Sequence, residues 1–223
     1  ARRGECEGTV VVAGRQLAGR GRRGREWWDE PGASVLMSIL LYPRLADDPR
    51  LAFVASVAVA ECIQACGLNI SLKWPNDVLI GDRKLCGILV ETAPVGGRTA
   101  ATIGIGINVA QREFPIEIAD TATSIALELG ASPDTTRLAE SLAEGVLDNY
   151  SQFLTHGFKE IVTRWRKYMW GVGLRVQINA EGSAFDGVIQ GVDDDGALVV
   201  RDASGADRVI YAADTIKTSI NRG

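Results

Sequence analysis

The chain has 223 residues, of which 46% are hydrophobic and 23% are charged, and its 24 basic and 28 acidic side chains give a formal net charge of −4. This composition excludes a disordered or fibrous chain, and the length allows one large domain or a medium domain with a small one. No apolar run reaches the roughly 18–20 residues that a membrane-spanning helix needs, and the acidic balance argues against bulk nucleic-acid binding.

The first half of the chain predicts a sheet-forming region. Short β-branched or apolar runs predict strands at residues 9–13, 34–41, 69–74, 78–80, 85–92 and 99–109, the first of them buried. A long loop rich in glycine and arginine is expected over residues 14–32, and a turn is expected between Pro43 and Pro49. Residues 51–66 predict a core helix that ends before Gly67.

The second half begins with helices and ends with strands. Helices are expected at residues 121–129, from Ser132 to about Leu154, and at residues 158–170. Past residues 171–173, short alternating strands at residues 175–178, 184–192, 197–202 and 207–211 predict a small barrel. This change of pattern divides the chain into a domain of residues 1–172 and a small C-terminal domain of residues 173–223.

The cysteines and the single histidine do not predict a metal site. They are Cys6, Cys62, Cys66, Cys86 and His156. Their spacings lack the short ligand pairs of a structural zinc centre. Because three of the cysteines lie inside apolar runs, buried thiols of a cytoplasmic protein are favoured. The opening segment ARRGECEG has no apolar stretch behind its arginines, so it is not interpreted as a signal peptide.

The most unusual segment is GRGRRGR at residues 19–25, which places four arginines in seven residues of an acidic protein. Glycine lets backbone amides approach an anion closely, and the forked donors of arginine bind carboxylate or phosphate. We interpret the segment as an anion-binding loop, and the neighbouring Trp27 or Trp28 could stack on a purine. A solvated flexible loop and an RGG-like nucleic-acid segment are the alternatives.

Two lysines belong to a second candidate cluster. The segments KWPND at residues 73–77 and KLCGIL at residues 84–89 place Lys73 and Lys84 on either side of a proline turn and a hairpin. A lysine held at a strand edge is suited to neutralising a carboxylate or phosphate during attack. Either lysine taken alone could instead extend only to water.

The remaining polar and glycine positions are weaker signals. Asn76 and Asp77 fit turn residues as well as ligand contacts, because both side chains can cap their own backbone. In GIGIN at residues 104–108, alternate glycines on one face of a strand leave a flat floor for a ligand or for another backbone. This is not a Rossmann fingerprint, since no third glycine opens a helix after it.

In this order and spacing, the segments resemble the biotin protein ligase family. The resemblance rests on residues 14–25 with Trp27 and on KWPND, KLCGIL and GIGIN, and it extends over the whole chain. It implies an α+β fold with two parts. The first is a mixed-sheet catalytic domain that resembles the class II aminoacyl-tRNA synthetase and biotin ligase fold, and the second is a small SH3-like β-barrel at the C-terminal end. It also implies the monofunctional type without the DNA-binding domain, so a repressor role has no support.

The activity implied by the resemblance is a two-step ligation. Biotin and ATP, with Mg²⁺ accompanying ATP, would form biotinyl-5′-adenylate and pyrophosphate. A lysine of a biotin carboxyl carrier domain would then attack the mixed anhydride. Joining two anions requires fixed positive charges and little water, and the reactive adenylate must be shielded until the acceptor arrives. A Gly/Arg loop that orders over the ligand would meet both needs.

The resemblance also implies roles for individual residues. The catalytic residues would be Lys84, Arg20 and Arg22. Biotin would be bound by Gln16, Arg20, Gly21, Arg22, Lys84, Gly87, Gly104 and Gly106, and ATP by Arg22, Trp27, Asn76, Lys84 and Asn108. Members of the family also carry a Ser-Thr-Asn segment that contacts biotin. Nothing like it precedes Thr9, so we expect the sequence to be a fragment of a longer polypeptide.

Three other functions are left open by the sequence. One is a related ligase for lipoate or another acyl group, and another is a catalytically idle module that sequesters biotin or docks a carrier domain. The weakest is nucleic-acid binding by the arginine loop, which steep salt dependence would reveal. The expected partners are therefore a carrier domain, biotin and ATP, with no nucleic acid and no membrane, and a homodimer is left open.

Overall fold

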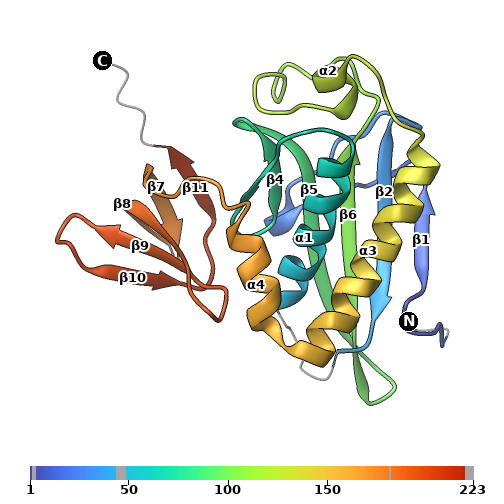
Figure 1. Cartoon of the computed structure of the whole chain (residues 1–223). Coiled ribbons are helices and arrows are strands. Elements are labelled where there is room, and N and C mark those ends of the chain that lie inside the picture. Colours follow the sequence, from blue (N-terminus) through green and yellow to red (C-terminus); the bar gives the residue numbers. More distant parts are fainter. Residues whose placement is uncertain (2–3, 44–48, 181, 219–223) are drawn as a thin grey trace.

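A computed structural model describes residue 1 and residues 4–43, 49–180 and 182–218 of the chain. These residues form a larger sheet covered by helices and a separate small sheet at the C-terminal end (Figure 1). Most of the turn expected between Pro43 and Pro49 lies outside the described residues. No helix in the described part of the chain is both long enough and apolar enough to cross a membrane.

The larger sheet has six strands, each antiparallel to its neighbours. In spatial order they are β1 (Val10–Ala13), β2 (Ser34–Leu41), β6 (Arg98–Asn108), β5 (Arg83–Val95), β4 (Asp77–Ile80) and β3 (Ser71–Lys73). The expectation of a mixed sheet is therefore wrong in this detail, because β3 to β6 follow one another through tight turns that reverse the chain. Among the described residues, parallel pairing is confined to isolated bridges, between Leu72 and Met169 and between Lys84 and Ala122.

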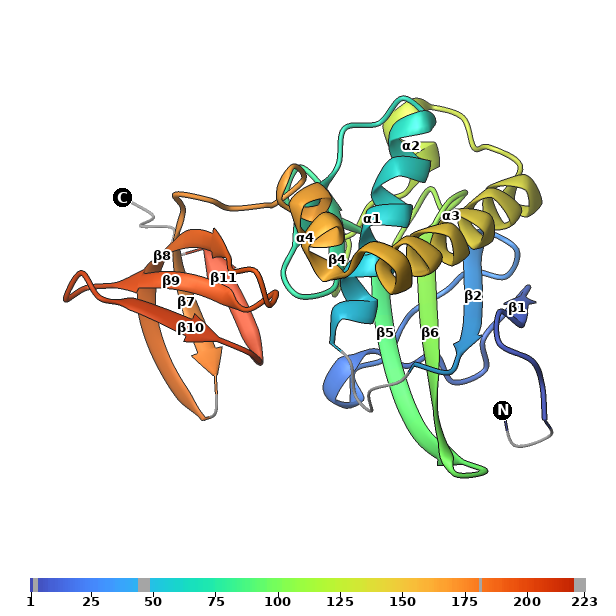
Figure 2. The same cartoon turned by 60° about the horizontal axis from the view of Figure 1, so that its bottom comes forward.

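Helices cover one face of this sheet, and the loop over residues 14–32 runs along the other (Figure 2). The covering helices are α1 (Arg50–Ala65), α3 (Thr135–His156) and α4 (Phe158–Arg166). Strand side chains alternate between the two faces. The isoleucines of β6 therefore pack into the helix-side core, while Gly104 and Gly106 face the loop. The sheet thus has one well-filled face and one face with little side-chain cover.

The first strand and the long loop differ from expectation. β1 lies at the edge of the sheet with β2 as its one neighbouring strand among the described residues, so Val11 and Val12 are 59% and 55% exposed rather than buried. The loop over residues 14–32 is not entirely irregular, since it contains a short 3-10 turn, η1 (Arg22–Gly24). An apolar β-branched run cannot by itself distinguish an edge strand from a central one.

The helix expected over residues 121–129 is shorter than predicted. It is α2 (Ile125–Leu129), and the Ser124 side chain caps its first turn by accepting a hydrogen bond from Leu127 N. The residues before it pair with β5, because Lys84 forms backbone hydrogen bonds with residues 121 and 123. Pairing with a distant strand has therefore replaced the first turn of the predicted helix.

The small C-terminal sheet has five antiparallel strands in the order β10-β9-β8-β7-β11. They are β7 (Arg175–Ala180), β8 (Ser183–Val192), β9 (Leu198–Asp202), β10 (Asp207–Ile210) and β11 (Thr215–Thr218). The last strand was not predicted, because its alternation of polar residues around Ile216 is a weak signal. Helices on an antiparallel sheet, followed by this small β unit, confirm the α+β fold class.

One turn of the C-terminal sheet is inserted against the helix-covered domain. The buried Trp74 donates a hydrogen bond from its indole Nε1 to the carbonyl oxygen of Gly196, at 2.9 Å. Gly196 has a φ of +85°, and a Cβ added there would lie 3.1 Å from the rings of both Phe53 and Phe158. Arg166 of α4 adds hydrogen bonds to the carbonyl oxygen of Val192, at 2.9 and 3.1 Å. A polar and an aromatic contact thus fix the small sheet in place.

Replacing Trp74 with phenylalanine should weaken this junction measurably. The change leaves the Gly196 carbonyl without its buried donor, and an unpaired buried polar group costs about 1–3 kcal/mol. We expect the free energy of unfolding from urea titrations to fall by that amount. Trp28→Phe is the matched control, since Trp28 is 37% exposed, and surface substitutions usually change stability by less than about 0.5 kcal/mol. Equal losses in the two variants would contradict a stabilising role for the Trp74 hydrogen bond.

Candidate functional site

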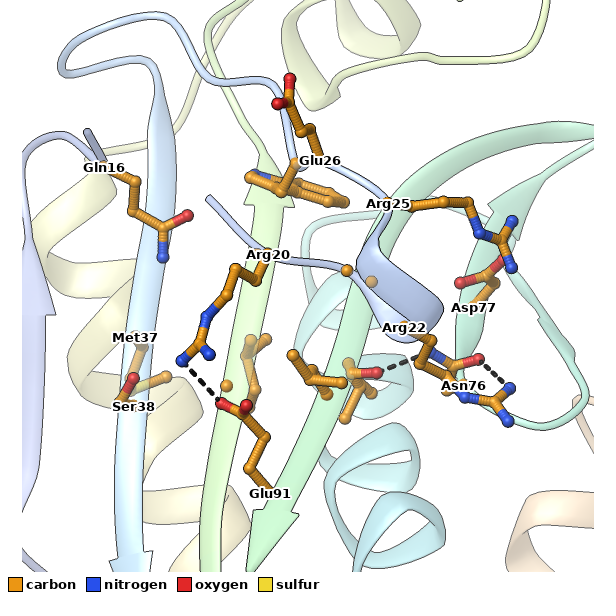
Figure 3. A pocket seen from close by; sticks show the side chains of 18 of the residues that line it. Gln16, Arg20, Arg22, Arg25, Glu26, Met37, Ser38, Asn76, Asp77 and Glu91 are labelled. Carbon is orange, nitrogen blue, oxygen red and sulfur yellow. Dashed lines mark hydrogen bonds and ion pairs between the residues drawn. The ribbon is translucent and has the colours of Figure 1, made fainter. Parts of the chain in front are cut away.

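A cavity of about 290 Å³ lies between the loop over residues 14–32 and the glycine-bearing face of β5 and β6 (Figure 3). The predicted site residues that line it are Gln16, Arg20, Gly21, Arg22, Trp27, Asn76, Lys84, Gly87, Gly104 and Gly106. They come from the loop, from the KWPND turn and from two strands. The structure therefore brings together every predicted site residue except Asn108.

Glycines form the floor of the cavity. Gly87 of β5 and Gly106 of β6 are directly paired across the two strands. A Cβ added at Gly106 would lie 2.7 Å from Cε2 of Trp27, and one added at Gly87 would lie 3.0 Å from its Cζ3. The indole ring can therefore rest on this floor only because both positions lack side chains. Its Nε1 atom is buried without a hydrogen-bond partner among the described residues, so it is free to donate to a ligand.

The neighbouring Trp28 does not share this position. Its ring packs against Phe114, with the centroids 5.6 Å apart, and it is absent from the lining of this cavity. Of the two adjacent tryptophans, Trp27 is therefore the one placed to contact a ligand in the cavity. The residue types left this choice open, and the resemblance had favoured Trp27.

An alanine at Gly106 is expected to displace the Trp27 indole. The added Cβ would overlap the ring, and inserting an extra carbon into a packed site typically costs about 1–3 kcal/mol. We expect this loss in the free energy of unfolding, together with a changed near-ultraviolet circular dichroism signal. The matched control is Gly104→Ala, whose Cβ would meet its nearest atom, the Leu89 carbonyl oxygen, at an ordinary 3.5 Å. An unchanged signal from Gly106→Ala would show that Trp27 does not depend on the bare floor.

The backbone of Lys84 is held from two sides. On one side, the β4–β5 pairing is irregular between Val78 and Leu79, and such a bulge redirects the side chains beside it. On the other side, Lys84 N donates to Thr121 O at 2.7 Å, and Lys84 O accepts from Thr123 N at 3.0 Å. These contacts on both sides give the start of the Lys84 side chain a defined position.

The ammonium group of Lys84 lies at the edge of the cavity beside a carboxylate. Its Nζ atom is 2.6 Å from Oδ1 of Asp77, and the two side chains are 36% and 30% exposed. The same ammonium lies 5.6 Å from the centroid of the Trp27 ring. Asp77 is thus the residue that orients Lys84, a role that the sequence did not assign.

Two arginines of the loop cross the mouth of the cavity. Arg20 forms an ion pair with Glu91 of β5 at 3.1 Å, and Arg22 donates from Nη1 to Oδ1 of Asn76 at 3.3 Å. Asn76 in turn donates from Nδ2 to the Ile88 carbonyl oxygen at 2.6 Å. Burial, followed by the charge of the adjacent arginine, lowers the pKa of Arg22. A guanidinium nevertheless stays charged at neutral pH, so both arginines remain cations here.

The other motif lysine, Lys73, lies away from this cavity. Its ammonium is 4.5 Å from the centroid of the Trp170 ring, and the Trp170 indole donates to Asp82 at 3.2 Å. Burial lowers the pKa of Lys73, while the charges of Asp77 and Asp82 oppose that effect. Lys73 lines a second cavity of about 400 Å³, which also touches Arg22 and Lys84. Its aromatic packing makes it primarily part of the junction between the two sheets.

Asn108 is the predicted site residue that the structure does not bring to the cavity. It is 4% exposed. Its Nδ2 donates to the Thr123 carbonyl oxygen at 3.0 Å, and its Oδ1 accepts a long hydrogen bond of 3.4 Å from Gln111. Gln111 also donates to Ser34 at 2.6 Å. Through these hydrogen bonds, Asn108 connects the end of β6 to the segment that leads to α2.

Several lining residues were given no individual role from the sequence, although Arg25 and Asp77 belong to segments that it singled out. They are Ala18, Arg25, Glu26, Met37, Ser38, Asp77, Ile88, Leu89, Glu91, Thr102 and Ile105. For Ser38 a usable signal existed, since strand alternation places it among apolar residues of β2, and it pairs with Gly104 in the sheet. The same alternation places Glu91 on the face of β5 that carries Gly87, whereas its ion pair with the distant Arg20 has no local signal.

The arrangement is suited to holding an anion next to a flat apolar or aromatic group. Lys84, Arg20 and Arg22 supply positive charge at the rim, and the Trp27 indole, lying on the glycine floor, supplies a flat aromatic surface. Fixed cations in a partly enclosed site act more strongly than cations in water. Nothing in this geometry is limited to one particular anion, so similarity to known proteins has to identify the substrates.

Sequence profiles of known families match both parts of the chain. The profile described as the biotin/lipoate A/B protein ligase family matches residues 5–108, and the profile of the biotin protein ligase C-terminal domain matches residues 172–217. The first match contains every residue that lines the cavity. The second covers nearly all of the C-terminal sheet.

Curated relatives match over most of this chain. It is 38% identical over 214 residues to the bifunctional ligase/repressor BirA of Bacillus subtilis (strain 168), a match that covers 93% of this chain and 66% of that protein. It is 34% identical over 213 residues to the biotin–[acetyl-CoA-carboxylase] ligase of Paracoccus denitrificans, with 92% and 88% covered. The chain thus spans slightly less than two thirds of the Bacillus relative and most of the Paracoccus relative.

Solved structures share the fold. The biotin protein ligase from Aquifex aeolicus in complex with biotin and ATP superposes with a TM-score of 0.87 and 30% identity, covering 96% of this chain and 91% of that chain. The apo structure of the Aquifex aeolicus protein gives a TM-score of 0.83 with 26% identity. At this coverage, the likeness includes both sheets and their relative placement.

Proposed function

Because the chain belongs to the biotin protein ligase family, we propose that it activates biotin with ATP and transfers the biotinyl group to a lysine of a biotin carboxyl carrier domain. The observation that carries this proposal is the cavity itself, which is lined by Lys84, Arg20 and Arg22 together with the glycines of β5 and β6. The Paracoccus relative, named as a ligase for acetyl-CoA carboxylase, and the Aquifex complex with biotin and ATP support the choice of substrates.

The first step brings two anions together. A carboxylate oxygen of biotin attacks the α-phosphorus of ATP, the bond from that phosphorus to the bridging oxygen breaks, and pyrophosphate leaves. Repulsion between the reactants opposes this approach unless fixed positive charge offsets it. Lys84, Arg20 and Arg22 supply that charge from three directions around the cavity, and we assign them the catalytic role. The ion pair with Asp77 orients the Lys84 ammonium before substrate arrives.

The other lining residues bind the two substrates in this proposal. Gln16, Gly21, Gly87, Gly104 and Gly106 join the three cations around biotin, and Trp27 and Asn76 join Arg22 and Lys84 around ATP. The unpaired Nε1 donor and the flat ring of Trp27 support its nucleotide contact. Asn108 is not carried into the proposal, because its carboxamide is hydrogen-bonded within the protein.

The second step transfers the biotinyl group. The neutral amine of the carrier lysine attacks the carbonyl carbon of the mixed anhydride, the bond to the AMP oxygen breaks, and the new amide loses a proton as AMP leaves. Until then the anhydride must be kept from water. The loop arginines Arg20 and Arg22, tied to Glu91 and Asn76, cover the cavity in a way suited to that need.

The proposal extends to the organisation of the whole chain. Residues 1–172 are taken as the catalytic domain and residues 173–223 as the small C-terminal domain, in line with the two profile matches. Mg²⁺ is expected to accompany ATP. We place the protein in the cytoplasm, because all four cysteines are free thiols, and free thiols are typical of reducing compartments.

Intact-mass spectrometry of an apo biotin carboxyl carrier domain tests this proposal. The carrier is incubated with the protein, MgATP and biotin, and parallel reactions replace biotin with lipoate or omit ATP. We expect one biotinyl adduct on one lysine, only in the presence of ATP and biotin. An adduct with lipoate but not with biotin would assign the protein to a related acyl ligase, and no adduct with either acid would contradict ligase activity of this chain.

A further inference from the structure

The tip of the Gly/Arg loop touches the C-terminal sheet at Asp214. The guanidinium of Arg23 forms an ion pair with the Asp214 carboxylate, in which the two side chains are 46% and 25% exposed. Arg25 donates from Nη2 to the backbone carbonyl oxygen of Asp214 at 3.3 Å. Both arginines lie in the loop that covers the cavity, whereas Asp214 directly precedes β11. Residues almost 200 positions apart are thus joined.

Asp214 is itself firmly attached to the rest of the protein. Its backbone N donates to the Asn179 carbonyl oxygen of β7 at 2.7 Å, and the preceding Ala213 is 4% exposed. The C-terminal sheet is in turn fixed to the larger domain by the buried hydrogen bond from Trp74 to Gly196. The carboxylate is therefore presented to the loop from a rigid support rather than from a free chain end.

The loop is constrained at the same place. Arg23 has φ 58° and ψ 39°, and it is the one non-glycine residue with a positive φ in the described part of the chain. This left-handed conformation is unfavourable for a side chain with a Cβ, so it persists only where surrounding contacts enforce it. Nearby, the loop is also held by the ion pair of Arg20 with Glu91 and by the hydrogen bond from Arg22 to Asn76. Arg23 itself is paired with Asp214.

We propose that Asp214 is a positioning residue that holds the tip of the Gly/Arg loop closed, so that the C-terminal sheet sets how long a ligand stays in the cavity. Arg25 and Arg22 line the cavity directly, and Arg23 lies between them. Releasing Arg23 from Asp214 loosens this part of the rim without removing any residue that contacts the ligand. The loop-closing part stands on the geometry, whereas retention of biotinyl-adenylate rests on the proposed function.

Hydrogen exchange in the free protein tests the loop-closing part without any substrate. We compare Asp214→Lys with Asp207→Lys, a matched charge reversal on β10 of the same sheet, where Asp207 pairs with Arg201. Reversing the charge beside Arg23 and Arg25 turns attraction into repulsion, and we expect exchange in peptides covering residues 19–27 to be about three- to tenfold faster. Asp207→Lys should leave those peptides unchanged.

A charge swap separates the ion pair from a general structural effect. In the double variant Arg23→Asp with Asp214→Lys, the pair is restored in reverse, so loop exchange, corrected for intrinsic rates, should return to within about twofold of the original. Equal exchange rates in Asp214→Lys and Asp207→Lys, or no recovery in the double variant, would overturn the proposal. Peptides from β2 and α1 serve as the check that each variant is folded.

The functional part is measured on the enzyme with substrates. After biotinyl-adenylate has formed, a chase with excess unlabelled biotin gives its rate of release. We expect release from Asp214→Lys to be about three- to tenfold faster than from Asp207→Lys, with recovery in the charge swap. If the unaltered protein forms no adenylate, the proposed function fails while the exchange result still decides the loop contact. Faster exchange without faster release would overturn the role in retention.

Discussion

Alanine in place of Lys84 is expected to slow the formation of biotinyl-adenylate by about 10²–10³-fold, the loss typical of removing one fixed stabilising group from a transition state. The ammonium is held at the cavity edge, 2.6 Å from Asp77, and its backbone is fixed by residues 121 and 123. The measurement is ATP–pyrophosphate exchange that depends on biotin.

Two further variants make the Lys84 result interpretable. Lys159→Ala removes an exposed lysine of α4 and should leave the exchange rate unchanged. Lys84→Arg keeps the charge but replaces a compact ammonium with a planar group, so we expect only partial activity. Unchanged urea denaturation in Lys84→Ala would exclude unfolding as the cause. Near-normal exchange in a folded Lys84→Ala protein would remove Lys84 from the catalytic role.

Glycine in place of Arg22 is expected to increase the rate of adenylate release by about 10–100-fold. The substitution removes the charge-assisted hydrogen bond to Asn76, and such bonds contribute about 1.5–3 kcal/mol. It also adds backbone freedom to the loop at η1. The adenylate should therefore appear in solution, where it can be separated from the protein by rapid filtration and quantified.

The control for this prediction is Arg15→Gly, the same chemical change in the same loop at an exposed residue that does not line the cavity. Release from that variant should match the unaltered protein. The two variants therefore distinguish loss of a specific attachment from a general increase in loop flexibility. If Arg22→Gly retained the adenylate as well as Arg15→Gly does, the loop could not be described as a cover over the cavity.

The parts of the site that were predictable are those encoded in local patterns. Alternating glycines in β6 place two bare positions on one face regardless of the rest of the fold, and the structure has that floor. Lys84 and the loop arginines were identified from the resemblance and from their residue types, and they do meet in one cavity. The α+β class was implied by the resemblance, and the structure confirms it.

Other features depend on contacts between distant segments and leave no local trace. The resemblance made Asn108 a candidate ATP contact, but Gln111 and Thr123 bind its carboxamide inside the protein. Val11 and Val12 look like core residues until the sheet order places their strand at an edge. The contact of Asp214 could not be predicted for the same reason, since its partners are loop arginines almost 200 residues away in the sequence.

The insertion of Gly196 between aromatic rings has a consequence for modularity. Two separate family profiles match the chain, which suggests parts that could be exchanged between relatives. Here, however, the turn of the small sheet fits only because position 196 has no side chain and a left-handed backbone, with Phe53 and Phe158 closing around it. Chimeras joined near residue 172 should therefore fold well only when the incoming C-terminal segment carries glycine at this position. The C-terminal sheet and the helix-covered domain must thus come from relatives whose contact residues fit each other.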